Sequence, residues 1–323
     1  MKVFDLHEDL SAYIIHERKA EDFKIDANRH ADIPKYFLSK TKAIVAAVFP
    51  AQNIVDEPMS KRYYSFKNSF NEALNHILTY YRFVRRYDVF KIVENRRFLA
   101  KLFSEKKGKI GLILGLEGAY PLREPYEIEL FYKLGVRVLG LTWNVDNQYA
   151  ASCMSKKDYG LTGLGENLVD LALEQGIVID LAHASEKTAI DVLSVSEKPV
   201  IISHAGLRRF NNSLRNVSDE VLELLKRNRG VIGIFFVSEY IKGNNTTIND
   251  VIDQIIYLKE NYGIDIVALG TDFFGTEKLP RGLEHIGKLM LLAKELTKAG
   301  LTESEVEKIF YANALRVFLE NMK

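Results

Sequence analysis

The chain has 323 residues, of which 47% are hydrophobic and 27% charged, a composition typical of a globular protein. Its 44 Lys and Arg residues nearly balance its 43 Asp and Glu residues, so its net charge does not favour nucleic acid or anionic lipid as a partner. A single cysteine, Cys153, excludes an intramolecular disulfide and a cysteine-based zinc cluster.

Eight short apolar runs alternate with helix-like stretches along the chain. They are rich in Val, Ile and Leu, as strands buried on both faces of a parallel sheet are. The runs are 2–6, 43–49, 110–116, 136–142, 177–182, 199–203, 231–236 and 265–271. No linker-like segment divides the chain. The pattern predicts one α/β domain over residues 1–323, a (β/α)8 TIM barrel whose functional site lies at the carboxyl ends of its strands.

Helix signals lie between these runs. Gly176 follows the helical pattern of 166–175 as a C-terminal cap, and Thr302 opens a capping box for a helix over 303–320. The long connection 52–107 mixes aromatic and basic residues, which a nucleic-acid surface also does. Its apolar residues fall at helical spacing, however, and predict an amphipathic helix with a solvated basic face. The residues of the predicted apolar face are Phe66, Phe70, Ala73, Ile77, Tyr81 and Val84.

Residues of the types that bind metal ions stand at the ends of five predicted strands. They are His7 and Asp9, Glu117, His183, His204 and Asp272. Each alone has an ordinary structural alternative, such as a helix cap or a hydrogen-bonded turn residue. Because the strand ends meet at one face of a barrel, their coincidence instead predicts a metal site. Imidazole and carboxylate ligands without thiolate suit zinc, manganese, iron or cobalt. Two ions about 4 Å apart need a shared carboxylate, and Glu117 comes from a strand between the two ligand groups.

At these positions the sequence resembles the membrane (renal) dipeptidase family, and the resemblance runs nearly end to end. The family opens with Asp-Gly-His-Asn-Asp-Leu, where this chain has Asp5-Leu6-His7-Glu8-Asp9-Leu10. Further matching segments are Ala31-Asp32-Ile33-Pro34-Lys35, Gly115-Leu116-Glu117-Gly118, Ile179-Asp180-Leu181-Ala182-His183, Pro199-Val200-Ile201-Ile202-Ser203-His204, Arg215-Asn216-Val217 and Gly270-Thr271-Asp272-Phe273. No single segment is decisive, but the ordered series is specific.

The resemblance implies an amidohydrolase-like barrel with two divalent ions, zinc first among the candidates. It implies that His7, Asp9 and Glu117 hold one ion, and that Glu117, His183 and His204 hold the other. A hydroxide bridging the ions would then attack the peptide bond of a dipeptide.

The resemblance also implies roles for two residues beside the ions. Asp272 would manage the proton between nucleophile and leaving amine, and Arg215 would bind the substrate's terminal carboxylate. The ordinary alternatives are a structural carboxylate for Asp272 and a surface ion pair for Arg215.

Three positions depart from the family pattern. Trp143 stands where many members carry a histidine thought to assist the tetrahedral intermediate, so it is either a wall of the substrate pocket or ordinary packing. Phe274 replaces the second Asp of Asp-Phe-Asp-Gly, and Leu6 and Glu8 replace the usual Gly and Asn. Substrate preference is therefore less well indicated than reaction class.

Two other functions stay open at this stage. An amidohydrolase of N-acyl amino acids or related amides would use the same residues, and Trp143 keeps that alternative open. A non-catalytic barrel would be expected to have lost a ligand, and none is missing. The sequence also leads us to expect a dipeptide or similar small amide as partner, no nucleic acid and no membrane, with a homodimer left open. Without an apolar leader or tail, the expected location is cytoplasmic.

Overall fold

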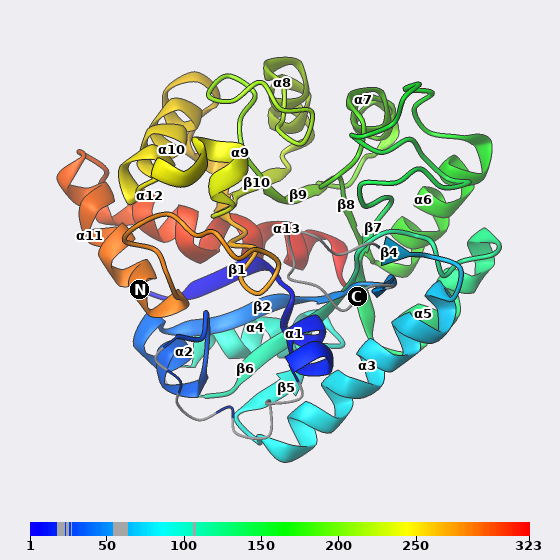
Figure 1. Ribbon diagram of the computed structural model, residues 1–323, viewed down its shortest axis with the longest axis horizontal. Coiled ribbons are helices and arrows are strands. Elements are labelled where there is room, and N and C mark those ends of the chain that lie inside the picture. Colours follow the sequence, from blue (N-terminus) through cyan, green and yellow to red (C-terminus); the bar gives the residue numbers. More distant parts are fainter. Residues whose placement is uncertain (18–22, 24–25, 27, 54–63, 106–107) are drawn as a thin grey trace.

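Eight parallel strands close into a barrel with helices around its outside (Figure 1). The protein is described here by a computed structural model covering residues 1–17, 23, 26, 28–53, 64–105 and 108–323. The barrel strands are β1 (Val3–Glu8), β2 (Thr41–Val48), β6 (Ile110–Leu116), β7 (Val136–Gly140), β8 (Val178–Asp180), β9 (Ile201–Ala205), β10 (Val231–Ile234) and β11 (Val267–Leu269). Pairing of β2 with β6 closes the ring. Each strand overlaps one predicted apolar run, so the predicted (β/α)8 barrel is confirmed.

Three short strands were not predicted. β5 (Phe90–Ile92) pairs in parallel with the first half of β6, outside the closed ring. β3 (Gln52–Asn53) and β4 (Tyr64–Ser65) form a small antiparallel pair. These three strands lie in the long connection between β2 and β6, whose residues 54–63 and 106–107 are outside the described part of the chain.

Most of the helices follow one another around the outside of the barrel in chain order, whereas Arg96–Ser104 and Asn313–Asn321 lie across its middle in this view (Figure 1). The helices are α1 (Leu10–Glu17), α2 (Ile33–Ser39), α3 (Ser69–Arg86), α4 (Arg96–Ser104), α5 (Ile128–Lys133), α6 (Gly163–Gln175), α7 (Glu186–Val195), α8 (Asp219–Asn228), α9 (Ser238–Ile241), α10 (Ile248–Tyr262), α11 (Leu289–Lys298), α12 (Glu303–Glu307) and α13 (Asn313–Asn321). Gly176 ends α6 in the left-handed conformation and Thr302 opens α12 with a capping box, both as predicted. The predicted helix 303–320 is interrupted by a π-helical turn at Lys308–Ala312.

The predicted apolar face of α3 is partly wrong. Ala73 and Ile77 are buried as expected, but Tyr81 is 37% exposed. His76 and Tyr80 are buried in its place, because their polar tips find partners: His76 bonds the Ser11 hydroxyl and the Tyr80 hydroxyl donates to the Ala47 carbonyl. A pattern based on apolar residues alone assigns such polar-tipped side chains to the solvent.

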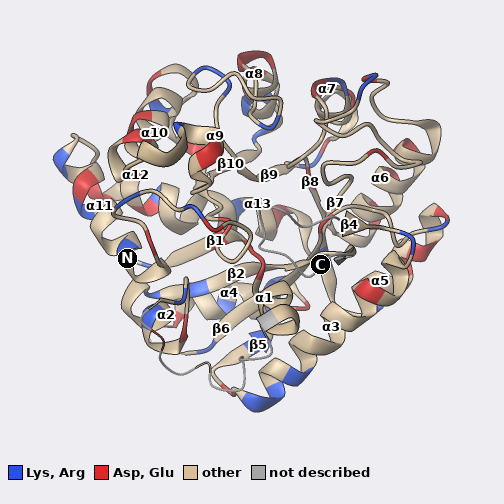
Figure 2. Cartoon of the chain, viewed as in Figure 1, with Lys and Arg blue, Asp and Glu red and all other residues tan. Residues whose placement is uncertain are grey.

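Charged residues of both signs are interspersed along the outer helices (Figure 2). The basic residues near the end of α3, Arg82, Arg85 and Arg86, are exposed, as expected for a solvated face. Among the described residues, no helix has both the length and the apolar character needed to cross a membrane.

Apolar side chains form two cores, one on each side of the barrel wall. The larger core lies between the strands and the outer helices. The smaller one draws residues from all eight barrel strands, together with α4 and α13, so it fills the interior. Phe4 of β1 contacts Phe318 of α13 there, with ring centroids 4.9 Å apart. The interior is therefore filled and covered at one end, which leaves the carboxyl ends of the strands for a site.

Above the interior core the barrel narrows around two glycines. A Cβ atom on Gly270 would lie 1.7 Å from the Ser203 carbonyl oxygen, and one on Gly233 would lie 2.0 Å from the same atom. Backbone cannot yield to such contacts as a flexible side chain can. Glycine at these positions lets β9, β10 and β11 approach closely beneath the strand ends.

We predict that Gly270→Ala lowers the free energy of unfolding by about 2–4 kcal/mol, because the added methyl overlaps the backbone of β9. Chemical denaturation would measure this. Gly163→Ala is the matched control, since a Cβ there meets nothing within 4 Å, and its stability should stay within about 1 kcal/mol of the wild type. Equal stabilities of the two variants would contradict the close-packing argument.

Candidate metal centre

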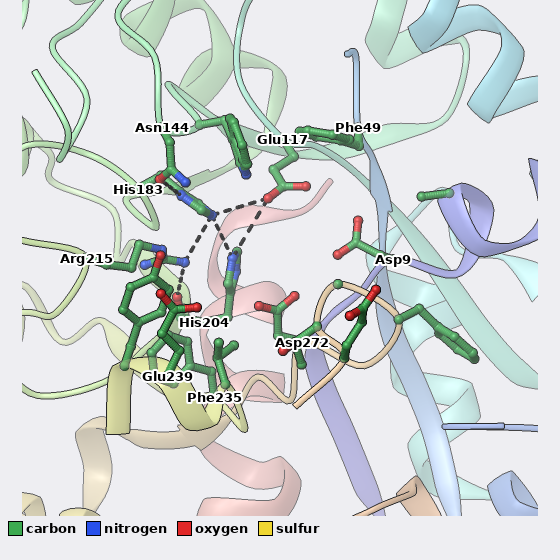
Figure 3. Close-up of a pocket in the computed structure, with 18 of the residues that line it drawn as sticks. Asp9, Phe49, Glu117, Asn144, His183, His204, Arg215, Phe235, Glu239 and Asp272 are labelled. Carbon is green, nitrogen blue, oxygen red and sulfur yellow. Dashed lines mark hydrogen bonds and ion pairs between the residues drawn. The ribbon is translucent and has the colours of Figure 1, made fainter. Parts of the chain in front are cut away.

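Side chains from five barrel strands converge at the carboxyl end of the barrel, around a cavity of about 250 Å³ (Figure 3). The six residues singled out from the sequence all lie here: His7 and Asp9 at β1, Glu117 after β6, His183 after β8, His204 in β9 and Asp272 after β11. All but His7 line the cavity, and His7 is buried against three of them.

Two of the histidines lie in β-bulges. Across Asp5–Glu8, β1 advances three residues while the paired strand β2 advances two. Across Ile202–Ala205, β9 likewise advances three residues while β10 advances two. A bulge re-aims the side chains at and beyond it. Leu6 therefore packs in the interior core while its neighbour His7 also faces inward, which strict alternation along a strand would forbid.

A buried carboxylate accepts hydrogen bonds from the backbone at each bulge. The side chain of Asp5 accepts from the backbone N–H of His7 (3.3 Å) and of Thr271 (2.8 Å). Asp180 Oδ1 accepts from the backbone N–H of Ser203 at 2.8 Å. These bonds satisfy buried backbone donors in and beside the bulged segments. Sequence analysis did not single out these two aspartates, although both stand in segments that resemble the family.

His7 is surrounded by carboxylates. Its Nε2 lies 3.4 Å from Asp9 Oδ2 and 3.8 Å from Glu117 Oε2. Asp272 Oδ1 lies 3.9 Å from the same nitrogen. This nitrogen is buried and makes no hydrogen bond to any described residue. Its lone pair or proton is thus directed into a cluster of anionic oxygens.

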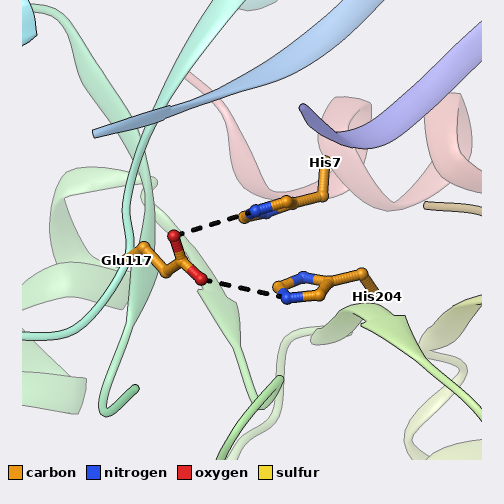
Figure 4. A group of neighbouring side chains, drawn as sticks. All are labelled: His7, Glu117 and His204. Atoms are coloured by element: carbon orange, nitrogen blue, oxygen red, sulfur yellow. Dashed lines mark ion pairs between the residues drawn. The ribbon is translucent and has the colours of Figure 1, made fainter. Parts of the chain in front are cut away.

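Glu117 stands between two groups of imidazoles. One of its oxygens faces His7 and the other faces His204 (Figure 4). Oε1 lies 3.3 Å from Nε2 of His183 and 3.9 Å from Nε2 of His204. Those two Nε2 atoms are 2.9 Å apart. A single carboxylate therefore reaches both groups, one oxygen to each.

Hydrogen bonds from the far side fix the orientation of two of these rings. Asn144 Oδ1 lies 2.7 Å from Nδ1 of His183, and an amide oxygen can only accept, so Nδ1 carries the proton and Nε2 keeps its lone pair. The hydroxyl of Ser203 lies 2.8 Å from Nδ1 of His204. Sequence analysis missed Asn144, which directly follows Trp143. Cys153 is not among the residues that line the cavity, and its thiol donates to Asn144 Oδ1 at 3.5 Å.

The acids of the site carry more negative charge than their surroundings balance. Burial raises the pKa of Glu117 well above its usual range, and the charge of Asp9 adds to this. Burial likewise raises the pKa of Asp272 to about 7, although His7 opposes the shift. For His7, burial alone would lower the pKa, but the neighbouring carboxylates, Glu117 foremost, raise it to about 10. All three pKa shifts arise because carboxylates are buried close together, an arrangement that a bound cation would stabilise.

The other two imidazoles are held neutral. Burial lowers the pKa of His183 well below its usual range, and the positive charge of Arg215 lowers it further. Burial and the charge of His7 do the same to His204. A neutral imidazole offers the lone pair that ligation of a metal requires.

The segment after β11 adopts an unusual backbone. Asp272 and Phe274 have φ values of 61° and 70°, a left-handed conformation that is rare for residues other than glycine. Gly275 follows, and a Cβ there would lie 2.1 Å from Asp272 Oδ1 and 2.4 Å from Asp9 Oδ2. Glycine thus leaves room for two carboxylates of the site. Strained backbone of this kind is concentrated at functional sites.

Arg215 is a buried cation on one side of the cavity (Figure 3). Its Nη2 donates to the carbonyl oxygen of His204 at 2.8 Å and lies 3.0 Å from His183 Nε2. Its guanidinium lies 5.7 Å from the ring centre of Phe235. Within the described part of the chain it forms no ion pair with a carboxylate, although buried arginines are normally paired. It is therefore available to an anion that enters the cavity.

Aromatic rings form another wall. Trp143 lines the cavity with Phe49 and Tyr64, whose ring centres lie 5.3 and 5.4 Å from its own. Its indole N–H makes no hydrogen bond to the residues that the structure describes. Trp143 therefore lies at the pocket, whereas the sequence left open whether it is a pocket wall or ordinary packing.

The donor set fits divalent metal ions. Two groups of side chains each bring ligand atoms within 4.8 Å of one another, His7–Glu117–His204 and His7–Asp9–Asp272. Nitrogen and oxygen ligands without sulfur are typical of zinc, manganese, iron and cobalt sites. Divalent cations would also supply the positive charge that the buried carboxylates lack. This grouping differs from the expected one in that His7 belongs to both groups and His183 to neither.

Comparison with known proteins shows the family to which the chain belongs. The sequence profile of the family described as membrane dipeptidase (peptidase family M19) matches residues 1–323. The chain belongs to this family. Dipeptidase ataJ of Aspergillus terreus is 31% identical over 279 residues, 78% of this chain and 68% of that protein. An uncharacterised dipeptidase of Schizosaccharomyces pombe, C965.12, is 34% identical over 220 residues, which cover 65% of this chain and 53% of the relative.

Among solved structures, a Rhodobacter sphaeroides metallopeptidase bound to a phosphinate mimic of L-Ala-D-Ala has the same fold. Its TM-score is 0.88, with 21% identity and 99% of each chain covered. The predicted family and the prediction of a metal-dependent dipeptidase are thus confirmed. Membership of this family also implies that the chain binds divalent metal ions.

We predict that divalent ions stabilise the protein against heat and that chelation reverses the effect. At a free ion concentration about 100-fold above Kd, linkage adds about 2.7 kcal/mol to the free energy of unfolding per site. Differential scanning fluorimetry with zinc, manganese or cobalt would measure the shift in Tm. In chelator, Glu117→Ala should be at least as stable as the wild type, since it removes a buried carboxylate, and added ions should raise its Tm far less. A Glu117→Ala protein with the full wild-type shift would contradict the role given to this residue.

Proposed function

We propose that this chain hydrolyses dipeptides with two divalent ions that share Glu117. In this proposal His7 and Asp9 complete one set of ligands, and His183 and His204 complete the other. The observation that carries it is the position of Glu117, whose two oxygens are directed to the two imidazole groups. Zinc is the first candidate metal, because imidazole and carboxylate ligands together suit it.

When bound, the ions would make a water acidic enough to attack near neutral pH and would polarise the scissile carbonyl. Asp272 is proposed to move the proton. Its carboxyl group lines the cavity beside His7 and Asp9. It would take the proton released by the water and deliver it to the nitrogen of the leaving amine.

Arg215 is proposed to bind the carboxylate at the C-terminus of the dipeptide. Its guanidinium is buried, lines the cavity and has no carboxylate partner among the described side chains. Two donors on one planar group suit a carboxylate. Because Arg215 also bonds the His204 carbonyl, the substrate's carboxylate would be held at a fixed distance from the ligands.

Trp143 is proposed as a wall that restricts which substrates fit. An indole has one N–H donor and no acceptor, so it cannot shuttle protons as the histidine of other members could. Its edge-on contacts with Phe49 and Tyr64 fix the ring in a rigid aromatic surface.

We also propose that the protein acts in the cytoplasm. Whether it forms a homodimer stays a prediction from the sequence.

The test is hydrolysis of a substrate panel by protein reconstituted with zinc, manganese or cobalt. The panel holds L,L- and L,D-dipeptides and the N-acylated form of each. We expect turnover of free dipeptides, two ions per chain by elemental analysis, and no turnover by Glu117→Ala. Turnover confined to N-acylated compounds would instead support an amidohydrolase of N-acyl amino acids. A metal-loaded protein inactive on the whole panel would favour a non-catalytic barrel.

We further predict that Arg215 contributes mainly to substrate binding and Asp272 mainly to the chemical step. Arg215→Met should mainly raise KM, since the carboxylate it holds is present throughout the reaction. Asp272→Asn should lower kcat by about 10²–10⁴-fold, because it removes a group that carries a proton in the transition state. Steady-state kinetics at matched metal content would measure both. Near-normal kcat in Asp272→Asn with both ions bound would show that Asp272 is not the proton carrier.

A further inference from the structure

Two acidic residues that line the cavity, Glu239 and Glu277, have no part in the metal centre. Glu239, on the short helix α9, lines the cavity and is exposed to it. Its carboxylate makes no hydrogen bond or ion pair with any residue in the described part of the chain. Lys278 also lines the cavity, but its ammonium donates to Asn244 Oδ1 at 3.1 Å and does not pair with Glu239. The charge of Glu239 is therefore not balanced by the protein.

Glu239 lies on the same side of the cavity as Arg215, with Asp9 on the other side (Figure 3). Hydrogen bonds fix the segments that carry them. The amide of Asn216, next to Arg215 in the chain, donates to the carbonyl of Tyr240 at 2.8 Å. The backbone N–H of Ser238 donates to the carbonyl of Lys278 at 3.0 Å. A cation and an anion are thus held at one end of the cavity without forming an ion pair with each other.

This arrangement has a consequence for the substrate. If Arg215 holds the terminal carboxylate, then the residue next to it is the C-terminal residue of the dipeptide, and Glu239 is an acidic group on that side. An acid in a partly desolvated cavity attracts a cationic group and disfavours an anionic one. The N-terminal residue lies beyond the scissile bond, toward Asp9 and the aromatic wall of Trp143. Glu239 is therefore placed for the C-terminal side chain and not for the α-amine.

We propose that Glu239 selects dipeptides whose C-terminal residue has a cationic side chain, such as lysine or arginine. The inference rests on the proposed dipeptidase function and on Arg215 as the carboxylate site. It makes Glu239 a determinant of specificity, with no part in holding the ions or moving the proton. Its effect should appear mainly in KM, since the ion pair exists in the bound substrate and in the transition state alike.

The experiment compares three substrates that differ only at the end of the second side chain. Alanyl-lysine carries an ammonium, alanyl-norleucine is a neutral analogue of similar length, and alanyl-glutamate carries an anion. Each is used with the second residue in the L and in the D form. We expect kcat/KM of the wild type to be about tenfold higher for alanyl-lysine than for alanyl-norleucine, and lowest for alanyl-glutamate.

Three variants then isolate the charge. Glu239→Gln should bring alanyl-lysine down to the level of alanyl-norleucine and leave alanyl-norleucine nearly unchanged. Glu239→Lys should reverse the order in favour of alanyl-glutamate. Glu174→Gln, which removes an exposed carboxylate on α6 outside the cavity, should keep the wild-type order. Metal content and Tm, measured for every variant, should match the wild type.

The outcomes separate this inference from the function on which it rests. Hydrolysis of all three dipeptides with no preference for lysine, or a preference that survives Glu239→Gln, would overturn the role of Glu239 and leave the dipeptidase intact. An equal loss on all three substrates in Glu239→Gln would show that Glu239 contacts a part common to them, such as the α-amine, and would also overturn it. A wild type that hydrolyses no dipeptide would overturn both proposals.

Discussion

The whole site depends on one electrostatic constraint: several carboxyl groups are buried together around His7. Asp9, Glu117 and Asp272 come from three different strands, and each would be more stable in water or farther from the others. The closed barrel can hold them together because its strand ends cannot move apart independently. The upward shifts in the pKa of Glu117 and Asp272 reflect the free-energy cost of burying these carboxylates close together. Divalent cations bound among the carboxylates would remove this repulsion, and the free energy gained would contribute to their binding.

The barrel provides this rigidity through features that a regular strand lacks. Gly233 and Gly270 allow three strands to approach beneath the site, and bulges in β1 and β9 turn two histidines inward. Asp5 and Asp180 accept hydrogen bonds from backbone N–H groups at these bulges. The ligand side chains thus depend on a backbone that is irregular in defined places. The backbone N–H groups at these irregular positions are satisfied by buried hydrogen bonds.

Much of this could be predicted from the sequence, for physical reasons. Strands buried on both faces must be apolar throughout, which reveals all eight of them, and barrel topology then gathers whatever follows their carboxyl ends. The same reasoning cannot detect a bulge, because an extra residue leaves no mark in an apolar run. It also cannot place His76 or Tyr80, whose burial depends on partners far away in the chain. Asn144 stayed hidden because its position depends on a loop, where the local sequence pattern carries little information about position.

The two bulges also bear on how such a protein can change over time. In an ordinary strand a conservative substitution is tolerated and a one-residue deletion reverses every side chain beyond it. In β1 the extra residue between Asp5 and Glu8 is what brings Leu6 and His7 to the same side. Deleting one residue there would restore regular alternation, so that only one of two neighbouring side chains could face inward. A change in the residue count of β1 or β9 would therefore disturb the site more than an exchange among Val, Ile and Leu in the same strands.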